Sequence, residues 1–257
     1  MELFLTKKNV IVTGASQGIG YAICERFLEE GANVSLVARR EEALRDAQHV
    51  LQAKYPESVV SYGICDCRHE SEVIALREQL TTQWPSIDIV VANVGDGRSV
   101  PDPVPDASQW QRVWASNFDA ALNTARTFLP ALEQAGGSLL FIASITGLEA
   151  FGAPVDYSTA KTAVIALTKN IARKVAPEVR VNALAPGNVF FPGGSWDEKI
   201  KQDRERVEGI IQASVPMRRF GTPGEIADAA VFLCSQRASF ITGAVLTVDG
   251  GQTVRIV

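Results

Sequence analysis

Short runs of β-branched and apolar residues alternate along this chain with longer stretches in which apolar residues recur at helical spacing. The short runs are typical of buried strands, and the 3.6-residue spacing is typical of amphipathic helices. The predicted strands cover residues 9–13, 33–38, 59–65, 87–92, 137–143, 179–184 and 244–248. The predicted helices cover residues 21–32, 41–54, 69–83 and 108–134, a segment that carries Tyr157 and ends near Val175, residues 199–209, and residues 223–235.

This regular alternation of strands and helices predicts an α/β fold. We expect a Rossmann-type, doubly wound, seven-stranded parallel sheet with helices on both faces, because crossovers between parallel strands are right-handed. No internal repeat or linker divides the sequence, so residues 1–257 are predicted to form a single domain. Ligands of such folds bind outside the carboxyl ends of the strands.

Composition narrows the range of functions. The chain has 257 residues, 46% of them hydrophobic, and its net charge of -4 lacks the basic excess of a nucleic-acid-binding protein. No apolar run approaches the roughly 20 residues of a membrane span, and the N-terminus does not resemble a signal peptide. We therefore expect a cytoplasmic protein with no nucleic-acid or membrane partner.

Cysteine and histidine give no sign of a metal centre. Cys65 and Cys67 are spaced too closely for a zinc site and have no second pair, so we interpret them as packing residues at the end of a strand. His49 and His69 lie in polar helical segments, which indicates surface positions. We predict no bound metal.

A glycine-rich turn follows the first predicted strand and leads directly into a helix. Glycines let the backbone approach a pyrophosphate closely, and a helix N-terminus offers free N–H groups and a positive dipole end. The spacing is G-x-x-x-G-x-G, which differs from the common G-x-G-x-x-G pattern. The candidate dinucleotide-binding residues of this turn are Gly14, Ser16, Gln17, Gly18, Ile19 and Gly20.

The end of the second predicted strand bears on the choice of cofactor. A carboxylate at this point would hold the ribose 2′-hydroxyl of NAD, but the sequence here reads Ala38-Arg39-Arg40. Arginine suits a 2′-phosphate by its charge and its fork of donors, so we favour NADP(H) over NAD(H). The alternative is that Arg39 and Arg40 are solvated charges that pair with Glu41 and Glu42.

Tyr157 and Lys161 lie four residues apart in an apolar, alanine-containing segment, so both project from one face of a helix. An ammonium group one turn away favours the anionic form of a phenol, and we expect Lys161 to lower the pKa of Tyr157. A tyrosine with such a pKa can act as an acid or base. The alternative, an ordinary amphipathic helix with a surface lysine, remains open on this spacing alone.

The segment from residue 188 to about 214 follows a strand and contains Phe190, Phe191 and Trp196 before a highly charged helix. Its position predicts a substrate lid with an apolar inner surface. The alternative is a simple loop followed by a surface helix.

Taken together, these motifs resemble the short-chain dehydrogenase/reductase family over nearly the whole chain. The glycine turn from Thr13 to Gly20, a serine (Ser144) some dozen residues before Tyr157-x-x-x-Lys161, and the closing Val-Asp-Gly-Gly occur in family order. The pattern is most similar to that of 3-oxoacyl-carrier-protein-reductase-like members. Further matching positions are Asp66, Asn93, Gly95, Asn117, Pro186 and Gly187.

The resemblance implies a role for each of these positions. Tyr157 would exchange a proton with the substrate oxygen, Ser144 would bind that oxygen, Lys161 would hold the nicotinamide ribose, and Asn117 would hold a water that links Lys161 to solvent. Asp66 would contact adenine. The remaining expected cofactor contacts are Asn93, Gly95, Pro186 and Gly187.

The resemblance also implies an oxidoreductase acting on a small carbonyl or alcohol, assembled as a homotetramer or homodimer. Two departures from the family pattern are visible. Ala92 replaces the first asparagine of the N-N-A-G motif, and Phe190-Phe191 stand where many relatives carry a threonine that binds the nicotinamide carboxamide. We expect the carboxamide to rely on the backbone of Val189. Two alternatives remain: an NAD-dependent alcohol or sugar dehydrogenase, and a non-catalytic nucleotide-binding relative that keeps the fold.

Overall fold

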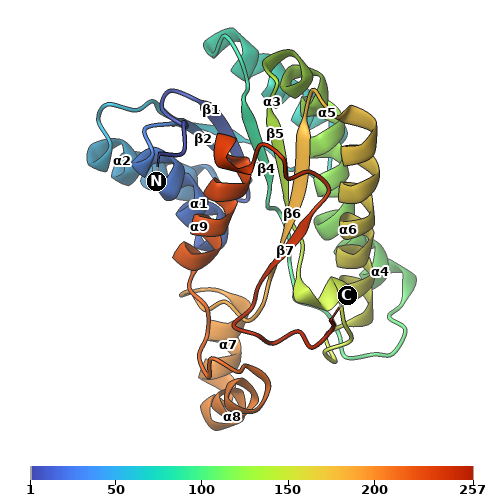
Figure 1. The fold of residues 1–257 in the computed structure, drawn as a ribbon. Coiled ribbons are helices and arrows are strands. Elements are labelled where there is room, and N and C mark those ends of the chain that lie inside the picture. Colours follow the sequence, from blue (N-terminus) through green and yellow to red (C-terminus); the bar gives the residue numbers. More distant parts are fainter. Residues whose placement is uncertain (1, 257) are drawn as a thin grey trace.

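Seven parallel strands form one continuous sheet at the centre of the computed structural model, which describes residues 2–256 (Figure 1). The strand order is β3-β2-β1-β4-β5-β6-β7, as expected for a doubly wound sheet. The strands are β1 (Asn9–Thr13), β2 (Asn33–Ala38), β3 (Val60–Ile64), β4 (Ile89–Ala92), β5 (Ser138–Ile142), β6 (Arg180–Pro186) and β7 (Val245–Val248).

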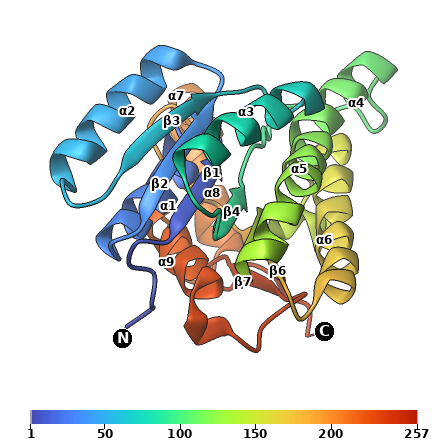
Figure 2. The ribbon, with the colours of Figure 1, turned by 90° about the horizontal axis from the view of Figure 1, so that it is seen from above.

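Helices cover both faces of this sheet (Figure 2). One layer contains α1 (Gly18–Glu29), α2 (Glu41–Lys54) and α9 (Pro223–Cys234), and the other contains α3 (Glu70–Gln83), α5 (Ala120–Ala135) and α6 (Val155–Val175). Alternate residues of β1 serve the two layers, because successive side chains of a strand point to opposite faces. Val10 and Val12 pack beneath α1, while Ile11 packs with Phe128 on the other side.

The strand order reverses between β1 and β4, which both leave the sheet at its carboxyl edge. Such a reversal opens a crevice where the two following segments diverge. The glycine turn after β1 and the loop after β4 meet there. Two further helices, α7 (Ser195–Gln202) and α8 (Arg204–Ser214), project beyond the same edge, outside both helical layers (Figure 1).

The seven strands and their parallel arrangement confirm the expected fold. The helical region predicted at 108–134 is present as α4 (Ala107–Trp114) and α5, joined without a break by a π-helical turn, Ala115–Asp119. The charged helix predicted at 199–209 was wrong in detail, because it is two helices: the backbone of Asp203 leaves the helical conformation (φ -156°, ψ 87°), and its side chain caps α8 by accepting a hydrogen bond from Arg206 N at 3.0 Å.

The cysteines and histidines occupy the expected positions. Cys65 and Cys67 are both buried in the core between the sheet and α3, and His49 and His69 are exposed. Within residues 2–256, no group of three or more histidine, cysteine or acidic side chains lies close enough to hold a metal ion. A search of the same residues finds no helix that is both long and apolar enough to cross a membrane.

Candidate active site

The glycine turn after β1 is built from close backbone contacts. Gly14 and Gly18 have φ angles of 66° and 62°, a left-handed conformation that glycine adopts without strain. A Cβ atom on Gly20 would lie 2.4 Å from the carbonyl oxygen of Gly14, so no other residue fits there. Gln17 provides no side-chain cap for α1, which leaves the first N–H groups of that helix available to an anion. This geometry fits the pyrophosphate of a dinucleotide.

Asn93 holds the turn in place from the adjacent strand end. Its Nδ2 donates to the carbonyl oxygens of Thr13 at 2.9 Å and Gly14 at 3.2 Å, and its backbone N donates to Thr13 Oγ1 at 3.0 Å. Ala92, the departure from the family pattern, is a buried core residue at the end of β4. The bonds from Asn93 to the glycine turn are intact despite the alanine.

Arg39, Arg40 and Asp66 line one end of the same cleft, at the ends of β2 and β3. Both arginines are exposed, and the ion pairs found among residues 2–256 include neither of them, so the predicted alternative of pairing with Glu41 and Glu42 is not observed. The Asp66 carboxylate accepts a hydrogen bond from Arg68 Nε at 2.9 Å, and this guanidinium lowers the pKa of the Asp66 carboxyl. Arg68 also lines the cleft and was not predicted from the sequence.

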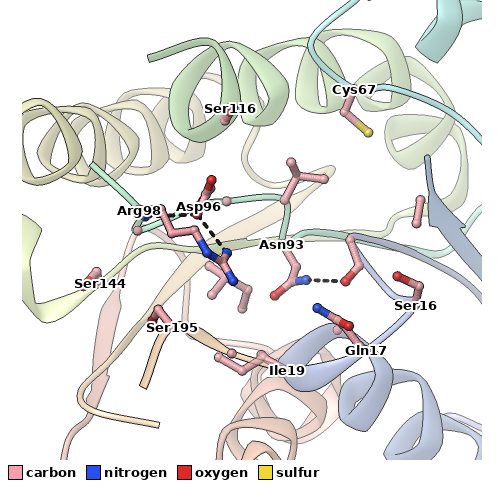
Figure 3. A pocket seen from close by; sticks show the side chains of 18 of the residues that line it. Ser16, Gln17, Ile19, Cys67, Asn93, Asp96, Arg98, Ser116, Ser144 and Ser195 are labelled. Carbon is pink, nitrogen blue, oxygen red and sulfur yellow. Dashed lines mark hydrogen bonds and ion pairs between the residues drawn. The ribbon is translucent and has the colours of Figure 1, made fainter. Parts of the chain in front are cut away.

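Ser144, Tyr157 and Lys161 meet at the opposite end of the cleft, whose volume is about 560 Å³. Figure 3 shows Ser144 at one side of the opening and Ser16 and Gln17 at the other. Ser144 follows β5, whereas Tyr157 and Lys161 lie one turn apart on α6. Lys161 is 3% exposed, and its Nζ donates to the carbonyl oxygen of Ile142 at 2.9 Å. Three of the four predicted catalytic side chains are therefore brought together, and the fourth, Asn117, does not line the cleft.

The pKa values at this end are governed by burial. Burial raises the pKa of the Tyr157 phenol, a hydrogen bond with Ser144 opposes that rise, and the Asp96 carboxylate adds to it. Burial also lowers the pKa of Lys161 to about 8. The prediction that Lys161 lowers the pKa of Tyr157 was thus wrong. Nζ lies 5.8 Å from the centroid of the phenol ring and is bonded to Ile142, so desolvation outweighs its charge.

Asn117 occupies the π-helical turn and is completely buried. Its Nδ2 donates to the carbonyl oxygens of Asp96 and Val113, both at 2.9 Å, and its Oδ1 accepts from Asp96 N at 3.1 Å. An amide nitrogen inserted against the Val113 carbonyl disturbs the regular helical ladder, which accounts for the interruption between α4 and α5. The side chain thereby anchors the loop that follows β4.

The segment after β6 closes the front of the cleft. Gly187 is packed so tightly that a Cβ would lie 2.8 Å from Asp249 Cα. Pro186, Gly187 and Val189 all line the cleft, as predicted. The ring of Phe191 lies against Gly18, within 2.7 Å of where a Cβ atom would stand, so this side chain spans from the segment after β6 to the glycine turn.

The three aromatic side chains of the predicted lid separate into two environments. Phe191 and Trp196 line the cleft, whereas Phe190 lines a second cavity between α7, α8 and the 218–220 segment. Phe220 lies between the two environments, with ring centroids 5.4 Å from Trp196 and 5.9 Å from Phe190. The predicted apolar inner surface therefore consists of two of the three aromatic residues.

A group of polar side chains over the cleft was not predicted from the sequence. Arg98, in the loop after β4, donates from Nη1 to Asp96 Oδ1 at 3.2 Å (Figure 3), and from Nη2 to Glu198 Oε1 at 2.7 Å. This links the loop to α7 across the opening. Arg112, Ser116 and Ser195 are further polar residues of the lining that were not predicted. Nothing in the proline-rich sequence around Arg98 identifies its partner, which lies 100 residues away.

Comparison with known proteins gives a consistent result. The family model described as enoyl-(acyl carrier protein) reductase matches residues 14–253. The chain is 36% identical to the short-chain dehydrogenase/reductase SDRA of Arabidopsis thaliana, over 98% of this chain and 97% of that protein. It is 34% identical to the 3-oxoacyl-[acyl-carrier-protein] reductase FabG of Chlamydia muridarum, over 98% and 99%.

A solved structure with a closely similar fold is L-sorbose reductase from Gluconobacter frateurii, complexed with NADPH and L-sorbose. It superposes with a TM-score of 0.92 at 30% sequence identity, covering 99% of this chain and 100% of that one.

Proposed function

Because this chain belongs to the short-chain dehydrogenase/reductase family of oxidoreductases, we propose that it is an NADP(H)-dependent enzyme acting on a carbonyl or secondary alcohol. The observation that carries the proposal is that one cleft holds Ser144, Tyr157 and Lys161 at one end and the glycine turn at the other. A bound nicotinamide would supply the hydride, and the protein supplies position, charge and a proton.

In the direction of reduction, Tyr157 Oη donates the proton that the substrate oxygen acquires. Ser144 Oγ donates a hydrogen bond to the same oxygen, which becomes more negative as the reaction proceeds. Lys161, with a pKa of about 8, carries a positive charge at pH 7 and favours the phenolate that Tyr157 leaves behind. Asn117 keeps the Asp96–Arg98 loop in place. We also propose that Asn117 holds a water that returns protons to Lys161.

Replacing Tyr157 with phenylalanine tests this assignment. Tyr157→Phe should abolish turnover while NADPH affinity stays nearly unchanged, because only the transferable proton is lost. Tyr62→Phe on β3, whose side chain lies outside the cleft, is the matched control and should keep full turnover. Both variants are assayed by cofactor absorbance and by NADPH titration. Turnover retained in Tyr157→Phe would contradict the assignment of Tyr157 as the proton donor.

The exposed, unpaired positions of Arg39 and Arg40 at the cleft support NADP(H). A charge-assisted hydrogen bond to a phosphate contributes enough that Arg39→Asp should weaken NADPH binding at least tenfold, by about 1.5–3 kcal/mol, and shift preference toward NADH. Arg45→Asp, an exposed position on α2 outside the cleft, controls for the change in net charge. Tighter binding of NADH than NADPH by the unaltered protein would favour an NAD-dependent alcohol or sugar dehydrogenase instead.

Polar groups around the substrate end, namely Asp96, Arg98, Ser116 and Ser195, support a small polar ketone. The similarity to L-sorbose reductase is compatible with this substrate class, while the similarity to 3-oxoacyl-carrier-protein reductases keeps a 3-oxoacyl thioester in consideration. A panel of sugars, small ketones and a 3-oxoacyl thioester, followed with both NADPH and NADH, separates them. Faster turnover of the thioester would overturn the polar-ketone assignment.

We also propose that the protein is a homo-oligomer, a homotetramer or homodimer. β7 ends the sheet as an unpaired edge strand, and Leu246 on it is partly exposed, as is Val155 at the start of α6. Apolar surface on an edge strand and a long helix is a favourable contact region. Light scattering after size-exclusion chromatography tests this, and a monomer at micromolar concentration would contradict it.

A further inference from the structure

We propose that Thr146 is a positioning residue that fixes the direction of the Ser144 hydroxyl proton. The inference rests on the proposed function, since it assigns Thr146 a task in the same reaction. Thr146 itself does not line the cleft and acts only through Ser144.

Ser144 Oγ accepts two hydrogen bonds from the same residue. The backbone N of Thr146 donates to it at 3.2 Å, and the side-chain Oγ1 of Thr146 donates to it at 3.0 Å. A serine hydroxyl has two acceptor lone pairs and one donor hydrogen. Both lone pairs are therefore occupied, and the one remaining hydrogen must point elsewhere.

Ser144 lines the cleft and Thr146 does not, and inside that cleft the Tyr157 phenol lies within hydrogen-bonding reach of Ser144. Two charged groups face this phenol, namely Lys161 from its own helix and Asp96 from the loop after β4. With its lone pairs filled, Ser144 can only donate toward the phenol or toward a substrate oxygen beside it. This direction of the hydrogen bond, from Ser144 to the phenol, is the one that Tyr157 requires as a proton donor. If Ser144 accepted the phenol proton instead, it would compete with the substrate for that proton.

The turn that carries Thr146 is fixed to the helix that carries Tyr157 and Lys161. Ile145–Gly147 forms a single 3-10 turn capped by Ser144. A Cβ on Gly147 would lie 2.7 Å from the backbone carbon of Lys161, and Thr162 Oγ1 donates to the Gly147 carbonyl oxygen at 3.0 Å. These contacts therefore hold Thr146 at a set position relative to α6.

Thr146→Val removes the donor and keeps the branched shape. We expect kcat to fall about three- to tenfold, as for loss of one hydrogen bond that matters in the transition state, with the KM for substrate and the NADPH affinity within about twofold. Thr146→Ser retains the hydroxyl and should recover most of the rate. Thr159→Val makes the same chemical change at an exposed position on α6 and should leave the rate unchanged.

A second measurement does not depend on turnover. The ¹³C chemical shift of the Tyr157 ring carbon bonded to oxygen, assigned with Tyr157→Phe, reports the hydrogen bond that Ser144 donates. It should move in Thr146→Val and stay in place in Thr146→Ser and Thr159→Val.

The two measurements separate failure of this inference from failure of the proposed function. An unaltered protein that reduces a carbonyl, together with a Thr146→Val variant that reduces it equally fast, overturns the role of Thr146 alone. If no carbonyl or alcohol is turned over, the proposed function fails, and the chemical shift then decides whether Thr146 orients Ser144. A Thr146→Ser variant as impaired as Thr146→Val would also overturn the inference.

Discussion

The two ends of the cleft are held together in different ways. At the nucleotide end, the glycine turn is shaped by backbone atoms in close contact, such as Gly20 against the carbonyl of Gly14. At the substrate end, the loop after β4 and the lid are joined by side chains, chiefly Arg98 and Glu198, which are each about half exposed. One end tolerates no added atom, whereas the other depends on contacts that water and salt can replace.

This difference is the one we expect from the ligands proposed for each end. A pyrophosphate presents the same oxygen atoms in every cofactor, so a fixed backbone cradle serves it and leaves a glycine pattern in the sequence. A substrate end has to match one particular molecule, and it does so with side chains on loops supported by a rigid sheet. We therefore expect substitutions at the nucleotide end to act on folding and cofactor binding, and substitutions at the lid to act mainly on substrate.

The largest effect should come from adding a methyl group to Gly20. Its Cβ would lie 2.4 Å from Gly14 O and 2.6 Å from Asn93 Nδ2, so the turn must shift. We expect Gly20→Ala to lower the free energy of unfolding by about 3 kcal/mol and to abolish NADPH binding. Urea unfolding and NADPH titration measure the two effects.

Gly209→Ala provides the matched control in the lid. Gly209 lies within α8, and a Cβ there would meet nothing within 4 Å. The same methyl group should raise stability by up to about 1 kcal/mol, because alanine is the better helix former. Equal stability losses in the two variants would show that close backbone packing does not distinguish the two ends.

Lys161, at the same end of the cleft as Ser144 and Tyr157, gives an effect on stability that depends on pH. Its pKa is lowered by burial from 10.5 to about 8, so the folded protein binds fewer protons than the unfolded chain between those two values. Stability therefore rises with pH across this window, and the cost of burying the cation is fully present below pH 8. The shift corresponds to about 3 kcal/mol.

Lys161→Met removes this titration and keeps an unbranched apolar side chain. The variant should be more stable than the unaltered protein at pH 7, and its advantage should shrink as the pH rises from 8 toward 10. Urea unfolding of both proteins at each pH measures the difference between their free energies of unfolding. The contributions of other titrating groups cancel in this difference. A difference that stays constant over this range would show that the ammonium group is not desolvated.

The contrast between the two ends of the cleft also explains which features could be predicted from the sequence. The seven strands, the glycine turn and the Tyr157–Lys161 helix face each depend on local periodicity or on residues close together in the chain. The meeting of Ser144 with Tyr157 was predicted from family order, and the structure explains it, because the 3-10 turn Ile145–Gly147 that follows Ser144 packs against α6.

Three features could not be predicted, each for a physical reason. The π-helical turn contains Asn117, whose side-chain amide bonds both to the Val113 carbonyl and to the backbone of Asp96, the latter a contact across 21 residues. The pKa of Tyr157 depends on desolvation, which spacing along a helix does not reveal. The link between Arg98 and Glu198 joins two segments that are separately unremarkable in sequence. All three need the tertiary structure to be known.

The smallest effect, and the sharpest test of the lid, comes from the link between Arg98 and Glu198. Arg98→Met should hardly alter stability, since exposed ion pairs contribute little, but it frees α7 from the loop and should raise the KM for substrate by no more than about fivefold. Arg204→Met breaks the exposed pair with Glu208 inside α8, without touching the cleft lining, and should leave KM unchanged. Added salt should weaken substrate binding by the unaltered protein and have less effect on Arg98→Met, because screening acts on the pair that the variant lacks. Steady-state kinetics at low and high salt measure this, and identical KM values for both variants would mean that the side-chain link does not hold the lid over the substrate.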